Sequence, residues 1–146
     1  MRHFGHPEGV AVGAHFRTRL DLLRAGVHGV LQAGISGSAA DGADAIIYSD
    51  AYEDNVDLGH TIYYPGHGGR SRASGKQVAH QQLTAGTRAL LTSLQTGLPV
   101  RVIRRVETDT GPQYRYDGLY RVTDLQETVG LSGYGILLFT FRQLPS

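Results

Sequence analysis

Residues 100–122, VRVIRRVETDTGPQYRYDGLYRV, contain two segments with the pattern of β-strands on either side of a polar turn. Residues 100–106 alternate between apolar and charged side chains, as expected of a strand with one buried face. Residues 107–113 are polar and include glycine and proline, which favours a turn. Residues 116–122 again carry aromatic and apolar side chains, so we expect a second strand there.

The same criteria extend to the rest of the chain. We expect further strands over residues 29–35, 43–49, 60–64 and 135–142, and loops over 36–42, 50–59 and 66–75. Apolar spacing predicts a short helix over residues 18–25 that ends at Gly26, and a longer one over 77–95 that ends before Pro99. About six short strands and two helices predict an α+β domain built on a curved sheet or a small barrel.

Composition sets limits on the class of protein. A chain of 146 residues with 20 glycines is expected to form one domain rich in tight turns. The absence of cysteine excludes disulfides and thiolate metal sites. No apolar run has the length of a membrane span, and the first ten residues lack the apolar segment of a signal peptide. We therefore expect a cytoplasmic protein.

Charge is distributed unevenly although the net charge is only +1. Residues 41–57 contain six acids and no Lys or Arg, whereas residues 58–106 contain seven basic residues and no acid. Thirteen of the fourteen basic residues are arginine, whose planar guanidinium matches phosphate oxygens. The basic segment is compatible with a solvated face and with a surface that binds a polyanion.

Residues 50–69, DAYEDNVDLGHTIYYPGHGG, place tyrosines beside polar groups. If strands 43–49 and 60–64 are neighbours, Tyr52 and Tyr64 can flank one cavity with Asp54 or Asn55 at its back. Two rings and a polar group can hold a planar heterocycle, because the rings stack on its faces while the polar group reads its edge. The alternative is that both tyrosines are ordinary core or surface residues.

Motifs of other activities are missing. The histidines form no HExxH or similar metal signature, no GxSxG motif is present, and GHGGR at residues 66–70 lacks the P-loop pattern. We predict no catalytic residues, no metal and no cofactor. A glycosylase that uses Asp54 as an acid or base is an alternative, but the sequence offers no second catalytic group at a plausible spacing.

The order and spacing of eight segments resemble the SRA (SET and RING associated), or YDG, domain family. The segments are PEGVAVGAHF (7–16), GVHGVLQAGISG (26–37), DGADAI (41–46), YEDNVD (52–57), GHGG (66–69), QQLTAGTRAL (81–90), LPVRVIR (98–104) and YRYDGLYRV (114–122). The resemblance implies one domain over residues 1–146 with a PUA-like twisted β-barrel flanked by short helices. It also implies binding of double-stranded DNA that carries 5-methylcytosine or 5-hydroxymethylcytosine, with the modified base flipped into an aromatic pocket.

In bacteria, similar domains are commonly joined to an HNH nuclease in modification-dependent restriction enzymes. No HNH pattern occurs in this chain. We therefore expect a binding module rather than an enzyme, the reader of a modification-dependent restriction system, with a nuclease domain as a possible part of a longer parent protein. In a bacterium such a reader would associate with the nucleoid.

The resemblance also implies roles for individual residues in the base pocket. Tyr52 and Tyr64 match the rings that sandwich the flipped base, and the carbonyl of Pro65 matches an acceptor for its amino group. Asn55 stands where the family has an acid that accepts from cytosine N4. Because an amide is neutral and also offers a donor, the choice between cytosine and thymine stays open. The pocket is completed by Asp54 and by two residues that replace a pair of glycines common in the family, Asp50 and Ala51.

Two loops are implied to enter the duplex. Gln32 matches the position that fills the hole left by the flipped base, where it can hydrogen-bond the orphan guanine. Arg70, Arg72 and Lys76 lie in a short second loop and are expected to contact phosphates. The YDG motif, residues 116–118, is expected to be structural. The departures at Asp50 and Asn55 leave one alternative, a PUA-like reader of another modified base or of RNA.

Overall fold

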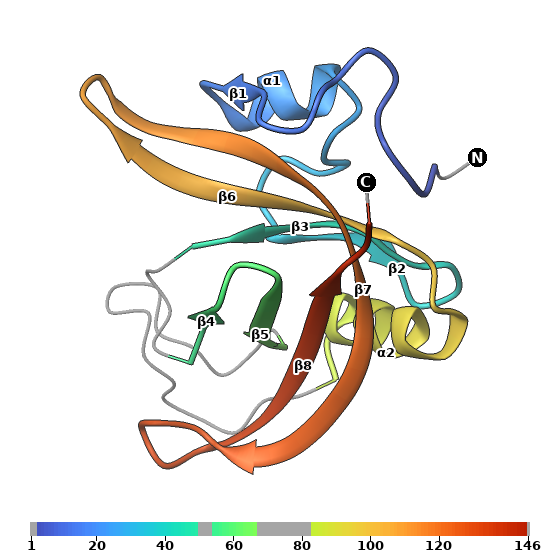
Figure 1. Ribbon diagram of the computed structural model, residues 1–146. Helices are drawn as coiled ribbons and strands as arrows, with labels where there is room; N and C mark the ends of the chain where they lie inside the picture. Colours follow the sequence, from blue (N-terminus) through green and yellow to red (C-terminus); the bar gives the residue numbers. More distant parts are fainter. Residues whose placement is uncertain (1–2, 50–53, 67–82, 146) are drawn as a thin grey trace.

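The computed structural model of the protein describes residues 3–49, 54–66 and 83–145. Two helices and eight strands occur in this part of the chain, and the strands form one sheet (Figure 1). This composition confirms the predicted α+β class. In chain order the elements are β1 (His15–Phe16), α1 (Arg19–Arg24), β2 (Ile35–Ser38), β3 (Gly42–Tyr48), β4 (Val56–Asp57), β5 (Thr61–Pro65), α2 (Ala85–Thr96), β6 (Val100–Thr108), β7 (Gly111–Val129) and β8 (Gly135–Gln143).

The strands follow the order β2-β3-β6-β7-β8-β5-β4, and the short β1 adds to β7. Among the described strand pairs, only β3 and β6 run parallel; the others are antiparallel. A parallel pair needs a long crossover connection, and here the segment between β3 and β6 contains β4, β5 and α2. The segment that carries most of the predicted site is therefore an insertion between two adjacent strands of the sheet.

Strand β7 gives the sheet its curvature. It has 19 residues, of which 111–120 pair with β6 and 120–129 pair with β8. The register shifts between Val122 and Asp124, and such an irregularity bends a strand and increases its twist. The bend carries β8, β5 and β4 round toward β3 and β6 (Figure 1).

Polar contacts join the two sides of the curled sheet. The hydroxyl of Tyr64 on β5 donates to the carbonyl of Ile47 on β3 at 3.2 Å, although these strands are not neighbours in the sheet. No strand pairing joins β2 to β4 within the described residues. The result is an open, rolled sheet, which agrees with the predicted PUA-like, barrel-like architecture.

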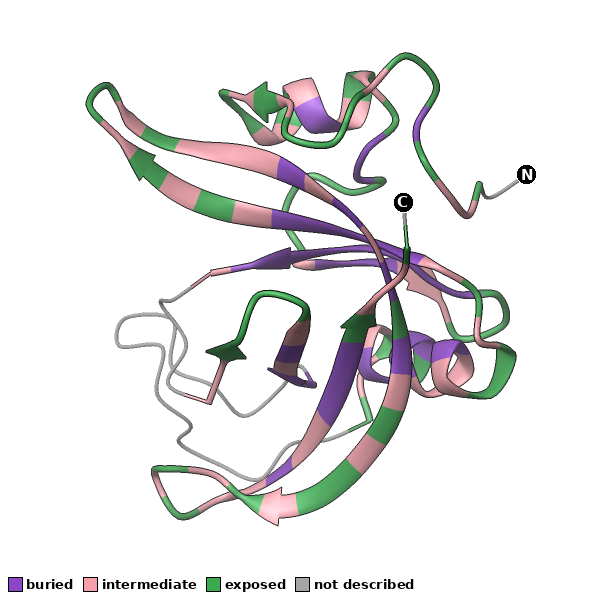
Figure 2. Cartoon of the chain, in the orientation of Figure 1, coloured by how far each residue is buried: buried purple, intermediate pink, exposed green. Residues whose placement is uncertain are grey.

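The hydrophobic core has two parts because β3 is buried on both faces (Figure 2). Ile46 and Tyr48 belong to the cluster inside the roll, which α2 covers with Ala89 and Leu90. Ile47 belongs to the second cluster, on the opposite face of β3. Helix α1 contributes Leu22 to this second cluster, whose members are Leu22, Val27, Ala45, Ile47, Ile103 and Tyr116.

Both predicted helices exist, with one shifted boundary. Thr18 caps α1 by accepting from the amide of Asp21. Helix α2 begins later than predicted, because Thr84 is its N-cap and accepts from the amide of Thr87. It ends at Gly97, which adopts the left-handed conformation with φ of 69°. Residues 77–82 of the predicted helix lie outside the described residues.

The prediction for residues 29–42 is wrong. Residues 29–34 form a loop rather than a strand, and the predicted loop over 36–42 contains most of β2 and the start of β3. Gly37 permits this hairpin, since a Cβ atom added there would lie 2.6 Å from the Cα atom of Ala43. Gly37 is therefore needed because the backbones of β2 and β3 approach closely, and it does not mark a loop.

Strand lengths also differ from the prediction. The turn expected over residues 107–113 is limited to residues 109 and 110, so β6 and β7 form a long hairpin. The two-residue strands β1 and β4 were missed, because so short a segment has no measurable periodicity. Neither described helix is long and apolar enough to cross a membrane.

Candidate nucleic-acid interface

The described part of the chain contains five of the predicted site residues, which are Gln32, Asp54, Asn55, Tyr64 and Pro65. They come from the loop before β2, from the two residues before β4 and from the end of β5. The remaining predicted residues lie outside the described residues, namely Asp50, Ala51, Tyr52, Arg70, Arg72 and Lys76.

Tyr64 and Pro65 are held at the end of β5. The Tyr64 side chain is 3% exposed, and its ring meets Phe141 edge-on with 5.8 Å between the centroids. With its hydroxyl bonded to Ile47, the ring is fixed at two points. Pro65 is buried and pairs with Leu138 as the last residue of the strand, where its missing N–H costs no ladder hydrogen bond inside the sheet.

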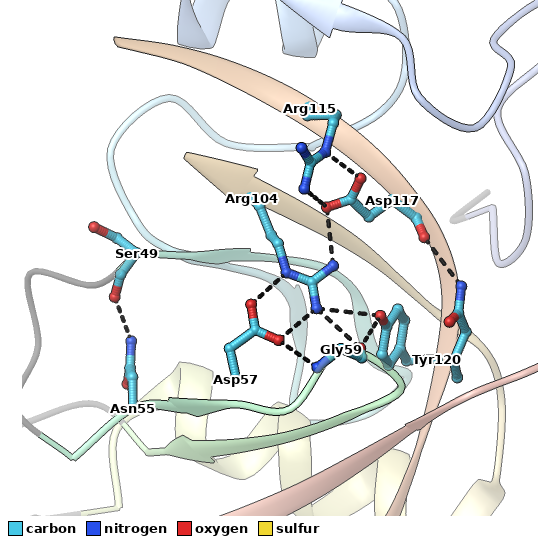
Figure 3. Close-up of polar contacts among 9 residues, drawn as sticks. Ser49, Asn55, Asp57, Gly59, Arg104, Arg115, Asp117 and Tyr120 are labelled. Carbon is cyan, nitrogen blue, oxygen red and sulfur yellow. Dashed lines mark hydrogen bonds and ion pairs between the residues drawn. The ribbon is translucent and has the colours of Figure 1, made fainter. Parts of the chain in front are cut away.

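Asn55 lies immediately before β4 and binds the end of β3. Its Nδ2 atom donates to the main-chain carbonyl of Ser49 at 2.6 Å (Figure 3). Its Oδ1 atom is buried and has no hydrogen-bond partner in the described structure. A buried acceptor without a partner is rare and costs free energy, so it is a place where a ligand donor would be favoured.

Arg104 fastens the β4–β5 turn to the rest of the sheet (Figure 3). Its guanidinium donates to the Asp57 carboxylate from Nε at 2.7 Å and from Nη2 at 2.8 Å, and to the carbonyl of Gly59 at 3.0 Å. The third guanidinium nitrogen, Nη1, donates to the carboxylate of Asp117 on β7 at 2.9 Å. The hydroxyl of Tyr120 adds a 2.6 Å bond to the same Gly59 carbonyl. Asn55, two residues before Asp57, therefore stands on an anchored segment.

The network keeps Arg104 and Asp57 charged. Burial lowers the pKa of Arg104, but hydrogen bonds with Asp57, Asp117 and Tyr120 outweigh burial and raise it. Burial raises the pKa of Asp57, but the bonds from Arg104 and from the amide of Gly59 bring it below its ordinary value of 3.8. The ion pair is intact at neutral pH.

Two arginines of the basic segment are not available to phosphate. The Arg104 side chain is only 12% exposed and already donates to Asp57, Gly59 and Asp117. Arg101 is buried, lies 3.6 Å from Asp44, and donates to the carbonyls of Val27, His3 and Gly5. For these two residues the polyanion-binding interpretation of the charge pattern is wrong, because their partners lie far away in the sequence.

Gln32 is exposed on the loop between α1 and β2. Side chains of the neighbouring segment hold the carbonyls of this loop. Arg19 donates to Val30 at 2.8 Å and to Ala33 at 2.6 Å, and the two ring nitrogens of His28 each lie 3.0 Å from a carbonyl oxygen, those of Val30 and Gly34. These contacts hold the loop on both sides of Gln32.

The comparison with known families agrees with this geometry. A family model described as the SAD/SRA domain matches residues 3–146. This chain belongs to the SAD/SRA domain family. The family predicted from the sequence is confirmed.

Relatives and solved structures resemble this SRA domain over almost its whole length. The Arabidopsis thaliana histone-lysine N-methyltransferase family member SUVH9 is 38% identical over 98% of this chain and 23% of its own length. The modification-dependent TagI restriction endonuclease is 38% identical, with a TM-score of 0.88 over 100% of this chain and 54% of that one. The SUVH5 SRA domain in complex with fully methylated CG DNA is 34% identical, with a TM-score of 0.83 over 99% of this chain and 95% of that one. The chain spans about a quarter of SUVH9 and about half of TagI.

The YDG motif of this SRA domain is structural, as expected. Tyr116 is fully buried, and its hydroxyl contacts Nδ1 of His6 at 2.7 Å. Asp117 accepts from Arg104 and from Arg115, whose Nε lies 2.6 Å from its carboxylate. Gly118 has φ of 99°, a conformation that favours glycine.

Asp54 is turned toward a different element from Asn55. Its Oδ1 atom accepts from the main-chain amide of Leu131 at 2.9 Å, in the turn between β7 and β8. A Cβ atom added to Gly130 in this turn would lie 2.6 Å from Oδ2 of Asp54. Sequence reasoning missed this contact, since the partners are far apart in the chain. We assign Asp54 to support of that turn.

Proposed function

We propose that this SRA domain binds double-stranded DNA containing 5-methylcytosine or 5-hydroxymethylcytosine and takes the modified base out of the duplex into a pocket. The buried, unpartnered Oδ1 atom of Asn55 is the observation that carries the proposal. It lies in the segment that resembles the base-binding segment of the family. SUVH5 SRA complexes with fully methylated and with fully hydroxymethylated CG DNA, both 34% identical to this chain, support the choice of ligand.

In the proposed complex, Tyr52 and Tyr64 stack on the two faces of the base. The Oδ1 atom of Asn55 and the carbonyl of Pro65 accept from its exocyclic amino group. Since Tyr64 is 3% exposed, entry of the base requires the atoms that cover its ring to move aside. The anchors of Tyr64 at Ile47 and of the β4 segment at Arg104 keep the pocket wall and the acceptor in place during that movement.

Most of the net affinity for DNA should come from contacts with its phosphate backbone. Extruding a base costs a few kcal/mol, and stacking returns about 1–3 kcal/mol per base. Net affinity must then come from phosphate contacts, for which we propose Arg70, Arg72 and Lys76. Gln32, on its fixed loop, is proposed to fill the space left in the duplex and to hydrogen-bond the orphan guanine.

The likeness to TagI supports a role in modification-dependent restriction. We propose that this domain is the reader of such a system and that cleavage belongs to a nuclease domain of the parent protein or to a partner. Because the chain spans 54% of TagI, the activity of a whole restriction enzyme is a proposal for the parent protein only. In a bacterial cell the reader would act in the cytoplasm on the nucleoid.

The test is a binding titration with duplexes that differ only in one central base pair, carrying cytosine, 5-methylcytosine or 5-hydroxymethylcytosine. We expect both modified duplexes to bind at least about tenfold more tightly than the unmodified one, a difference of about 1.4 kcal/mol. Tyr52→Ala should abolish this preference. Tyr63→Ala is the matched control, because Tyr63 lies on the opposite face of β5 from Tyr64. Equal binding of all three duplexes, or tighter binding of an RNA of the same sequence, would refute the proposal.

A further inference from the structure

We infer that the main-chain carbonyl of Ser49 fixes the orientation of the Asn55 carboxamide, so that Asn55 presents its acceptor oxygen to the edge of a bound base and selects an amino-bearing base over a carbonyl-bearing one. The inference rests on the proposed function. It concerns the choice between 5-methylcytosine and thymine, which the amide at this position otherwise leaves open.

The two ends of the amide have different environments. Nδ2 lies 2.6 Å from the Ser49 carbonyl oxygen, a distance that only a donor can occupy, since two acceptors would repel each other there. Oδ1 therefore lies on the other side of the carboxamide, where it is buried and has no partner in the described structure. Rotating the amide by half a turn would break the bond to Ser49 and place two oxygens in contact.

Both partners stand on fixed segments. Ser49 directly follows β3, which lies between β2 and β6 in the sheet. Asn55 directly precedes β4, which Arg104 anchors through Asp57. The orientation of the amide is therefore a property of the folded sheet rather than of a loosely held side chain (Figure 3).

The consequence for recognition follows from the chemistry of the bases. 5-Methylcytosine and thymine both carry a methyl group at C5, but cytosine presents an amino donor at the position where thymine presents a carbonyl acceptor. The free Oδ1 atom pairs with the amino group and repels the carbonyl. A freely rotating amide would accept either base by turning over, whereas the bond to Ser49 removes this choice.

The pH dependence of binding distinguishes this role of Asn55 from a purely structural one. A carboxamide does not titrate, so the wild-type preference should not change between about pH 5 and about pH 8. In Asn55→Asp, an ionised carboxylate would face the Ser49 carbonyl and be repelled, whereas a protonated carboxyl group would donate to Ser49 and still accept from the base. The affinity of this variant for 5-methylcytosine, relative to wild type, should therefore rise as the pH falls.

The experiment compares 5-methylcytosine with thymine, each placed opposite an abasic site so that differences in base pairing do not contribute. Wild type should prefer 5-methylcytosine by about tenfold or more, corresponding to about 1.4 kcal/mol. Asn55→Ala should keep only the smaller preference that the Pro65 carbonyl can supply, and a thermal melt of each variant checks that it folds. Asn55→Asp should gain relative affinity toward acidic pH.

Four results would count against the inference. Equal binding of 5-methylcytosine and thymine by wild type, with 5-methylcytosine still preferred over cytosine in paired duplexes, would overturn the inference and leave the proposed function intact. An undiminished preference in Asn55→Ala, or an Asn55→Asp variant that gains relative affinity toward alkaline pH, would also overturn it. Loss of the preference over unmodified cytosine in paired duplexes would overturn the proposed function and the inference together.

Discussion

The guanidinium of Arg104 binds the carboxylate of Asp57 with two hydrogen bonds of 2.7 and 2.8 Å, one to each carboxylate oxygen. This pair ties β4 to β6, two strands that are distant in the order of the sheet. It stands two residues from Asn55 and so fixes the acceptor of the proposed pocket. This contact therefore contributes both to the stability of the domain and to the geometry of the proposed pocket.

Removing the Arg104 side chain should destabilise the fold. Breaking a buried ion pair by removing one partner leaves an uncompensated charge, and because the Asp57 side chain is 27% exposed we expect a loss of about 2–3 kcal/mol in the free energy of unfolding. Urea unfolding of Arg104→Ala measures it. Arg105→Ala is the control, since Arg105 is more exposed and makes only a 3.4 Å contact with Glu107, worth about 0–1 kcal/mol. Similar losses in both variants would contradict the assigned role of Arg104.

The buried histidine His28 should make stability depend on pH. Burial lowers its pKa below the ordinary 6.5 and, with a smaller contribution from Arg19, outweighs the hydrogen bonds with the carbonyls of Gly34 and Val30, which raise it. The unfolded chain then binds more protons in this window, so the stability from His28 is complete above pH 6.5 and is lost as the pH falls through the folded pKa. Unfolding free energies at about pH 5.5 and about pH 7.5 should differ less in His28→Asn than in wild type. The exposed His15→Asn serves as control, and an unchanged slope in His28→Asn would argue against this origin.

Gly37 should tolerate no side chain. A Cβ atom there would lie 2.6 Å from the Cα atom of Ala43, a contact with backbone that can be relieved only by moving β2 away from β3. We expect Gly37→Ala to cost at least about 2 kcal/mol. The comparison is Gly13→Ala, where a positive φ of 96° imposes strain but no atom lies within 4 Å, so the loss should be about 1 kcal/mol. Equal losses measured by thermal unfolding would show that the close approach is unimportant.

Tyr64→Phe should separate the two roles of this tyrosine. Loss of the hydroxyl removes the hydrogen bond that Tyr64 donates to the buried main-chain carbonyl of Ile47. Losing this bond should lower the free energy of unfolding by about 1–2 kcal/mol. The ring remains, so the preference for modified over unmodified duplex should persist. Chemical denaturation and a DNA titration on the same protein measure both effects. A variant that is fully stable but loses the preference would place the hydroxyl, rather than the ring, in base recognition.

The sequence pattern predicted the regular strands and the family but not the long-range side-chain contacts. Residues 100–106 and 135–142 form strands because alternating or continuous apolar side chains face the core, and this property is local. Residues 29–34 have a similar composition, yet Arg19 and His28 bind their carbonyls, so the backbone has partners without a strand. No local pattern distinguishes these two cases.

In the candidate site, too, the sequence motif predicted individual residues but not their long-range contacts. The family motif identified Asn55 and Tyr64, but it could not reveal which end of the amide faces Ser49, because that depends on how the end of β3 meets the start of β4. Charge counting likewise treated Arg101 and Arg104 as members of a basic segment. Their acidic partners Asp44 and Asp57 come from another part of the chain, so only the fold shows that these charges are already paired.

The most direct measurement is a crystal structure of this domain with a duplex that carries one central 5-methylcytosine. We predict that the base lies outside the duplex between Tyr52 and Tyr64, with its amino nitrogen about 3 Å from Oδ1 of Asn55 and with the Ser49 bond of Asn55 retained. A 5-methylcytosine that stays stacked and paired in the duplex, or that is extruded elsewhere on the protein, would contradict it.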